Sequence, residues 1–117
     1  MTITVSSEEF TEFMFFGFQK HVLDLSNKAY TGIVSRTPVK TGQLRASWNM
    51  TKGSPDYSTV DSGVGLSPPS PPEIKFGFLE YPVIYIVNGK PYASIMENGG
   101  SKQAPNGMVA VTLAGLK

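Results

Sequence analysis

The sequence predicts an α+β fold in which a long N-terminal helix packs on a small antiparallel β-sheet. Two observations support this: a helical pattern that runs without proline to Arg36, and later stretches with the alternation or β-branched content of strands. The 117 residues suit one domain, assigned to residues 1–117, because a chain of this length buries one modest core. A projecting loop over residues 51–72 and a short C-terminal element complete the predicted architecture.

The first helix has a clear beginning and a clear end. Ser6 or Ser7 can cap it, and the glutamates that follow give its first turn the negative charge that a helix N-terminus favours. Pro38 ends it, because the residue before a proline avoids the helical region. Apolar residues recur between these points at steps of three and four, as expected for one buried stripe: Phe15, Phe18, Val22, Leu25, Ala29 and Ile33.

Four large apolar residues lie off that stripe, in the N-terminal half of the helix: Phe10, Phe13, Met14 and Phe16. Either the rest of the fold wraps this end, or a second helix face docks on a neighbouring subunit. Aromatic residues and methionine are typical of interface cores, and burial of each phenylalanine is worth roughly 1.5–3 kcal/mol. We favour the interface and take these four residues as candidate contacts.

The chain after Pro38 is predicted to turn at Thr41-Gly42 and to enter a strand in which Leu44, Ala46 and Trp48 alternate. Residues 51–72 are then rich in glycine, serine and proline, which predicts a loop that projects from the domain. Long loops in compact domains are usually functional or disordered. The proline cluster of this loop is a second candidate interface: Pro68, Pro69, Pro71 and Pro72.

Further strands are predicted at residues 74–78 and 83–87, and the second is apolar on both faces, as in the centre of a sheet. Asn88-Gly89 follows as a strong hairpin signal. Residues 92–96 then form either the partner strand or a turn of helix. The tail at residues 108–113 is likewise either a strand or a short helix, since its spacing and its β-branched content disagree.

The residue types that catalysis needs are sparse. The absence of cysteine excludes disulfides and thiolate metal sites, and the single histidine, His21, lies in mid-helix among apolar neighbours. Ser47 and Ser94 lack a nucleophile-elbow context, and Glu80 and Glu97 are not brought together by any sequence pattern. We therefore expect a protein that is not an enzyme, with no catalytic site, cofactor or metal. No apolar run approaches the length of a membrane span, so no membrane partner is expected.

One charge pattern supports a different function. Between Asp24 and Asp56 every ionised side chain is basic: Lys28, Arg36, Lys40, Arg45 and Lys52. Such a stretch can meet phosphates, which keeps a small DNA-binding accessory domain as an alternative. Against it, the net charge is only +1 and no series of stacking aromatic residues surrounds these cations.

Two segments resemble a known family. Residues 37–48 resemble the P-V-[D/K]-T-G-x-L-R-x-S segment of neck and minor tail components of siphophage-type tailed bacteriophages. Residues 91–108 are similar to that family's Y-A-x-x-x-E-x-G-x-S-x-x-A-P-x-G-M run. We assign fold-defining roles to Pro38, Thr41, Gly42, Leu44, Arg45 and Trp48 in the first segment, and to Tyr92, Glu97, Gly99, Pro105, Gly107 and Met108 in the second.

With the preceding helix, the resemblance covers nearly the whole chain except residues 51–72. Lys40 departs from the commoner aspartate, and the C-terminal helix is shorter than usual. Gly99, Gly100 and Gly107 are expected to supply positive φ angles. Arg45 and Glu97 are expected to form an ion pair that joins the two segments.

The resemblance implies a tail-completion protein. Copies of the chain would form a ring, six-fold in symmetry, between the head-connector proteins and the tail-terminator or tail-tube proteins, with genomic DNA passing through its channel. The protein would then belong to the virion neck or upper tail, and to the host cytoplasm during assembly. A tail-terminator or head-closure subunit of the same junction is the alternative within this class.

Overall fold

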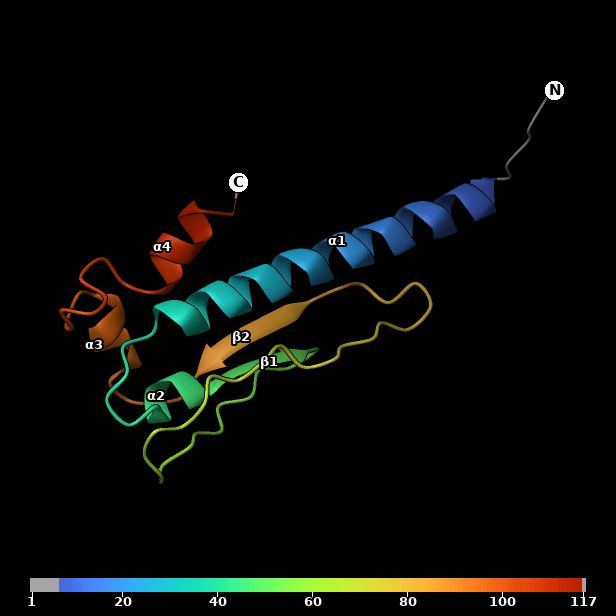
Figure 1. The fold of residues 1–117 in the computed structure, drawn as a ribbon. Coiled ribbons are helices and arrows are strands. Elements are labelled where there is room, and N and C mark those ends of the chain that lie inside the picture. Colours follow the sequence, from blue (N-terminus) through green and yellow to red (C-terminus); the bar gives the residue numbers. More distant parts are fainter. Residues whose placement is uncertain (1–6, 117) are drawn as a thin grey trace.

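The computed structural model describes the backbone of residues 7–116 and the side chains from Glu12 to Leu116. The elements follow one another as α1 (Ser7–Arg36), α2 (Gln43–Ala46), β1 (Trp48–Lys52), β2 (Ile84–Asn88), α3 (Ala93–Glu97) and α4 (Val109–Ala114). Figure 1 shows α1 running alongside the two strands, with α3 and α4 gathered near its C-terminal end. The predicted α+β class, with a long N-terminal helix on an antiparallel sheet, is confirmed.

The sheet of the described residues has two strands. β1 and β2 pair in antiparallel register, with Trp48 opposite Asn88 and Lys52 opposite Ile84. Two strand predictions are therefore wrong, because residues 43–46 form the helix α2 and residues 74–78 stay irregular. The strand predicted at residues 83–87 is confirmed by β2, but in a two-stranded sheet it is an edge strand and not a central one. The helical alternatives for residues 92–96 and for the tail are confirmed by α3 and α4.

The end of α1 is fixed by a polar network that continues into the sheet. Thr37 turns its hydroxyl back to the Ile33 carbonyl at 2.7 Å and accepts a hydrogen bond from the Trp48 indole N–H at 2.8 Å. Tyr30 donates its hydroxyl proton to the Trp48 carbonyl at 2.9 Å, and burial raises the pKa of this phenol. The helix thus stops at Arg36, where the following proline requires it to stop.

The core lies under the C-terminal half of α1. Its fully buried members come from α1, β1 and the second motif segment: Tyr30, Ile33, Val34, Trp48, Met50, Ala104 and Met108. The predicted stripe is only half correct, because Ala29 and Ile33 are buried but Phe18 and Leu25 lie at the exposed margin. The N-terminal half of α1 therefore contributes little to this core.

The molecule is elongated. Its radius of gyration is 17.8 Å, against roughly 13 Å for a compact domain of this length. Figure 1 shows the N-terminal turns of α1 running past the end of the sheet. None of the helices in the described part of the chain combines the length and hydropathy needed to cross a bilayer.

Candidate functional site

The two motif segments meet at one end of the molecule, and Glu97 is the residue that joins them to α4. Its carboxylate accepts hydrogen bonds from the backbone N–H groups of Met108 and Val109, both at 2.8 Å, and of Ala110 at 3.0 Å. Partial burial raises the pKa of Glu97, but these three donors outweigh it and hold the pKa below its ordinary value. Glu97 therefore caps the first turn of α4 from a distant position in the chain.

Gly107 makes this cap possible. Its φ is +89°, and a Cβ placed there would lie 2.5 Å from the Glu97 carbonyl oxygen and 2.7 Å from its Oε2 atom. Any side chain would therefore be strained and would also displace the carboxylate. Gly99 likewise has a positive φ, as predicted, whereas the same prediction for Gly100 is wrong.

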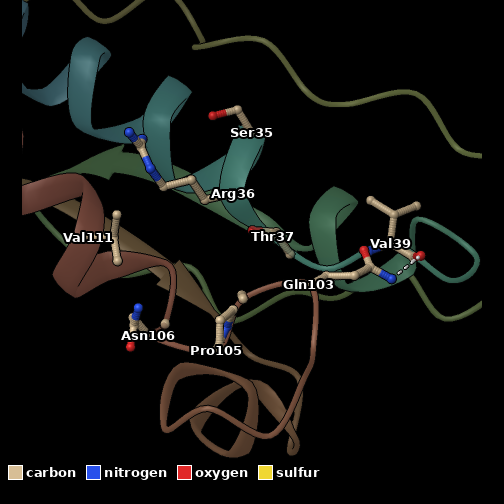
Figure 2. Close-up of a pocket in the computed structure, with 10 residues that line it drawn as sticks. Ser35, Arg36, Thr37, Val39, Gln103, Pro105, Asn106 and Val111 are labelled. Carbon is tan, nitrogen blue, oxygen red and sulfur yellow. Dashed lines mark hydrogen bonds between the residues drawn. The ribbon is translucent and has the colours of Figure 1, made fainter.

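A wide polar pocket of about 510 Å³ opens between the end of α1, residues 103–107 and α4, as Figure 2 shows. At its edge the Gln103 side chain binds the Val39 backbone twice, accepting from N–H at 2.9 Å and donating to the carbonyl at 3.2 Å. Arg36 donates to the Gly32 carbonyl and to the Thr112 hydroxyl, each at 3.3 Å. These contacts lock the first segment, the second segment and α4 into one unit.

Arg45 does not pair with Glu97, so that prediction is wrong. Its guanidinium instead donates to the Leu66 carbonyl at 2.7 Å, and the Leu66 N–H donates to the Thr41 carbonyl at 3.2 Å. Gly42, with φ +90°, lets the Leu66 backbone approach, since an added Cβ would lie 2.8 Å from the Leu66 oxygen. The first motif thus turns the chain, as predicted, and also holds the long loop against the body.

The loop itself differs from the prediction. Thr51 and Lys52 extend β1, and the irregular segment runs on to Val83 because the expected strand at residues 74–78 does not form. The loop is also fastened to the domain rather than free to project. Asn49, Ser47 and Gln43 all hydrogen-bond its backbone, at distances of 2.7 to 3.1 Å.

An ion pair that the sequence pattern does not indicate also holds the loop. The Lys90 ammonium is buried and forms an ion pair with Asp61 at 2.5 Å. The hydrogen bond from Lys90, with a second from Thr59, holds the pKa of Asp61 below its ordinary value. Gly89 is expected in a hairpin turn. In the structure, its lack of a side chain instead lets the Tyr57 carbonyl pack directly against its backbone, where a Cβ would clash.

The candidate contacts on α1 are exposed where the structure describes them. Phe13, Met14 and Phe16 are 74%, 55% and 67% exposed, and Phe10 lies outside the described side chains. The fold adds two rings from the loop, Phe78 at 78% and Tyr81 at 68%. The sequence pattern of residues 76–81 indicates a strand and a connection, and nothing in it places them beside α1.

We call the exposed rings of Phe13, Phe16, Phe18, Phe78 and Tyr81 the aromatic surface. The loop reaches α1 because the buried Gln19 amide donates to the Gly77 and Glu80 carbonyls, at 3.1 and 2.6 Å. Phe16 and Phe78 line one groove beside this contact, and Phe18 meets Tyr81 on the other side with ring centroids 5.8 Å apart. At ~200 Å² per ring, the five rings together expose roughly 650 Å², divided between two sides of α1. The side with Phe13, Phe16 and Phe78 exposes roughly 440 Å², which is within the range of the largest apolar patch of a typical monomer.

The other sequence-derived candidates are more dispersed. Among the four prolines, Pro69 is half-buried and Pro68, Pro71 and Pro72 are exposed on the loop. The basic stretch does not form one face, since Arg36 and Arg45 bind backbone carbonyls and Lys52 pairs with Glu80 at 3.0 Å. His21 is exposed on α1, and the side chains described form no group of three metal-binding residues.

No family model, curated protein or solved structure matches the chain.

Proposed function

We propose that this protein is a non-enzymatic structural subunit of the neck or upper tail of a tailed bacteriophage. In this proposal several copies form a ring, six-fold in symmetry, that completes the tail and joins it to the head connector. Genomic DNA passes through the ring without specific contact. The protein then belongs to the virion, and to the host cytoplasm while the particle is being assembled.

The aromatic surface is the observation that carries this proposal. A monomer that exposes roughly 650 Å² of aromatic area loses the benefit of burying it, and a standard interface covers about 800 Å² on each partner. The Phe13–Phe16–Phe78 side alone, at roughly 440 Å², supplies about half of what one partner contributes to such an interface. Many such contacts around a ring add up to a durable assembly.

The junction of the two motif segments gives independent support. The two segments that resemble phage neck proteins contact each other through Val39 and Gln103, and Glu97 of the second segment binds the first turn of α4. Two pairs of charged side chains, Lys52–Glu80 and Lys90–Asp61, make structural contacts that hold the loop in place. The motif residues thus behave as determinants of shape.

An assembly experiment tests the proposal. The purified protein is mixed with tubes assembled from the tail-tube protein of the phage that encodes it, and the tube ends are examined by electron microscopy. We expect density that caps the ends and is lost with a Phe13→Ser/Phe16→Ser variant of unchanged melting temperature. Tubes that remain bare with folded wild-type protein contradict a tail-completion role.

The same experiment separates the alternatives. A head-closure subunit would bind the connector and leave tube ends bare, whereas a tail terminator would cap tubes as they finish growing. A DNA-binding accessory domain would instead retain duplex DNA on a filter at low salt and release it as salt increases. The dispersal of Arg36, Arg45 and Lys52 into internal contacts makes this last result the least expected.

A further inference from the structure

A second apolar surface lies on the opposite side of α1 from Phe16. It is a groove of about 390 Å³ between α1, the start of β2 and the end of α4. Apart from Ser26, its lining is entirely apolar, and we call it the acceptor groove: Leu25, Ala29, Ile84, Ile86, Leu113 and Leu116. Leu113 is 53% exposed although it belongs to α4, so no described part of the chain covers it.

The acceptor groove has the size and chemistry to take an aromatic side chain. Its volume falls within the range of about 300–1,000 Å³ that small-molecule pockets occupy, so a phenyl ring fits. None of the described residues that line it is charged, which makes it a poor site for a polar ligand. An aromatic anchor in an apolar pocket is the usual centre of a protein interface.

The chain cannot fill this groove with its own aromatic surface. Phe16 and Leu25 are nine residues apart, about two and a half helical turns, and so point to opposite sides of α1. Phe16 and Ala29 are separated by roughly 20 Å along the axis at ~1.5 Å per residue. A straight helix holds the two surfaces apart, and only another molecule brings them together.

We propose that the Phe13–Phe16–Phe78 side of one copy inserts into the acceptor groove of the next copy. This inference rests on the ring proposed above and specifies its subunit contact. The contact is heterologous, because two different surfaces meet and each copy keeps one of each free. Repetition of such a contact adds copies in one direction, and the rotation between copies closes the series into a ring.

Gly17 is consistent with this contact. It lies between the exposed Phe13 and Phe16 on one side and His21 on the other, and a Cβ added to it would meet nothing within 4 Å. Glycine in the interior of a helix is unfavourable relative to alanine, and no packing contact in the described part of the chain requires it here. Because Gly17 has no side chain, the C-terminal end of α4 in a neighbouring copy can approach α1 closely at this position.

Two complementary variants test the direction of the contact. Phe16→Glu removes the inserted ring and keeps the acceptor groove intact. Leu113→Glu places a charge in the acceptor groove and keeps the inserted ring intact. Both positions are exposed, so both variants are expected to fold, and melting temperature verifies this. Phe13→Glu and Leu25→Glu replace them if either fails to fold. Val64→Glu is the matched control, since Val64 is 79% exposed and lies outside both surfaces.

Wild type and Val64→Glu are expected to self-associate, and each test variant to weaken self-association by roughly 30-fold or more. An equimolar mixture of the two test variants should form a dimer and nothing larger, because one intact contact remains between them. If Leu113→Glu assembles alone, or the mixture stays monomeric, or wild type is a monomer, the proposed contact is wrong. A wild type that still caps tail tubes in those cases retains the proposed function with a different subunit contact.

Discussion

Single residues far apart in the sequence determine how the short elements of this protein hold together. Glu97 is the clearest case, because one carboxylate satisfies three backbone N–H groups at the start of α4, and Gly107 leaves room for it. α4 has only six residues and no capping side chain of its own. A helix so short depends on such tertiary contacts for its stability.

Replacement of Glu97 by glutamine tests the cap. We expect the variant to lose about 2 kcal/mol of unfolding free energy at pH 7, since a charged acceptor serves several donors. Thermal melting measures the loss, and Glu73→Gln, on an exposed pair with Lys75, is the control that should not change. Equal melting temperatures for wild type and Glu97→Gln would contradict the cap.

The same residue predicts a pH dependence. The folded protein holds the pKa of Glu97 below its ordinary 4.5, so near that pH the unfolded chain binds more protons. The stability that the ionised carboxylate contributes is therefore complete above pH 4.5 and is lost as the pH falls through the lower folded pKa. The difference in melting temperature between wild type and Glu97→Gln should shrink as the pH is lowered below this value.

Removal of the Lys90–Asp61 ion pair is expected to detach residues 57–61 of the loop from the rest of the domain. In Asp61→Asn the buried Lys90 ammonium loses its carboxylate, and residues 57–61 should separate from Gly89. Chymotrypsin should then cleave after Tyr57 faster than in wild type, while Asp24→Asn, on the exposed side of α1, should cleave at the wild-type rate. Unchanged cleavage of Asp61→Asn would show that the pair does not hold the loop.

At the scale of elements, α1 contains two glycines with opposite surroundings. A Cβ at Gly17 meets nothing, whereas a Cβ at Gly32 would lie 2.7 Å from the Thr112 methyl group on α4 and 2.9 Å from the Arg36 guanidinium. Gly32 is therefore required where α1 and α4 cross, and Gly17 is not required by the fold.

This contrast gives a paired prediction. Gly17→Ala should stabilise the unassociated chain by about 1 kcal/mol, or roughly 3–6 °C in melting temperature, through helix propensity. Gly32→Ala should destabilise it by about 1–3 kcal/mol, because α4 must shift. Dilute thermal melts followed by circular dichroism compare the two variants. A stabilising Gly32→Ala would contradict the packing of α4 on α1.

The sequence predicts the elements that depend on local backbone geometry and misses those that depend on contacts between distant residues. The helix stop at Pro38 and the turn at Gly42 depend on local backbone geometry, which is visible in one residue and its neighbours. The strand expected at residues 74–78 does not form, and the Gly77 carbonyl is instead bound by the Gln19 amide from 58 residues away, a contact that no local pattern shows. Asn88-Gly89 fails as a hairpin because the Tyr57 carbonyl rests on Gly89, and no local pattern shows that contact.

The candidate site was likewise predicted in part. The off-stripe aromatic residues of α1 were recognisable because they break the helical period, and Phe13, Met14 and Phe16 are indeed exposed. Phe78 and Tyr81 were missed because their place beside α1 depends on the same Gln19 contact. The acceptor groove was missed because three separate elements form it.

The whole molecule has its core at one end and its exposed aromatic rings towards the other. A radius of gyration of 17.8 Å, well above roughly 13 Å for a compact chain, is the consequence of extending α1 beyond the sheet. In a ring this extension is what reaches the neighbouring copy. The elongated shape and the exposed aromatic surface are thus two aspects of one proposed role.

The mass of the purified protein in solution, measured by light scattering over a range of concentrations, tests that role most directly. A closed ring of six 12.7-kDa chains has a mass of about 76 kDa, and we expect this species to form and to disappear with Phe16→Glu. A species of 12.7 kDa at every concentration, unchanged when tail tubes are added, would contradict the proposal that this chain is a ring subunit.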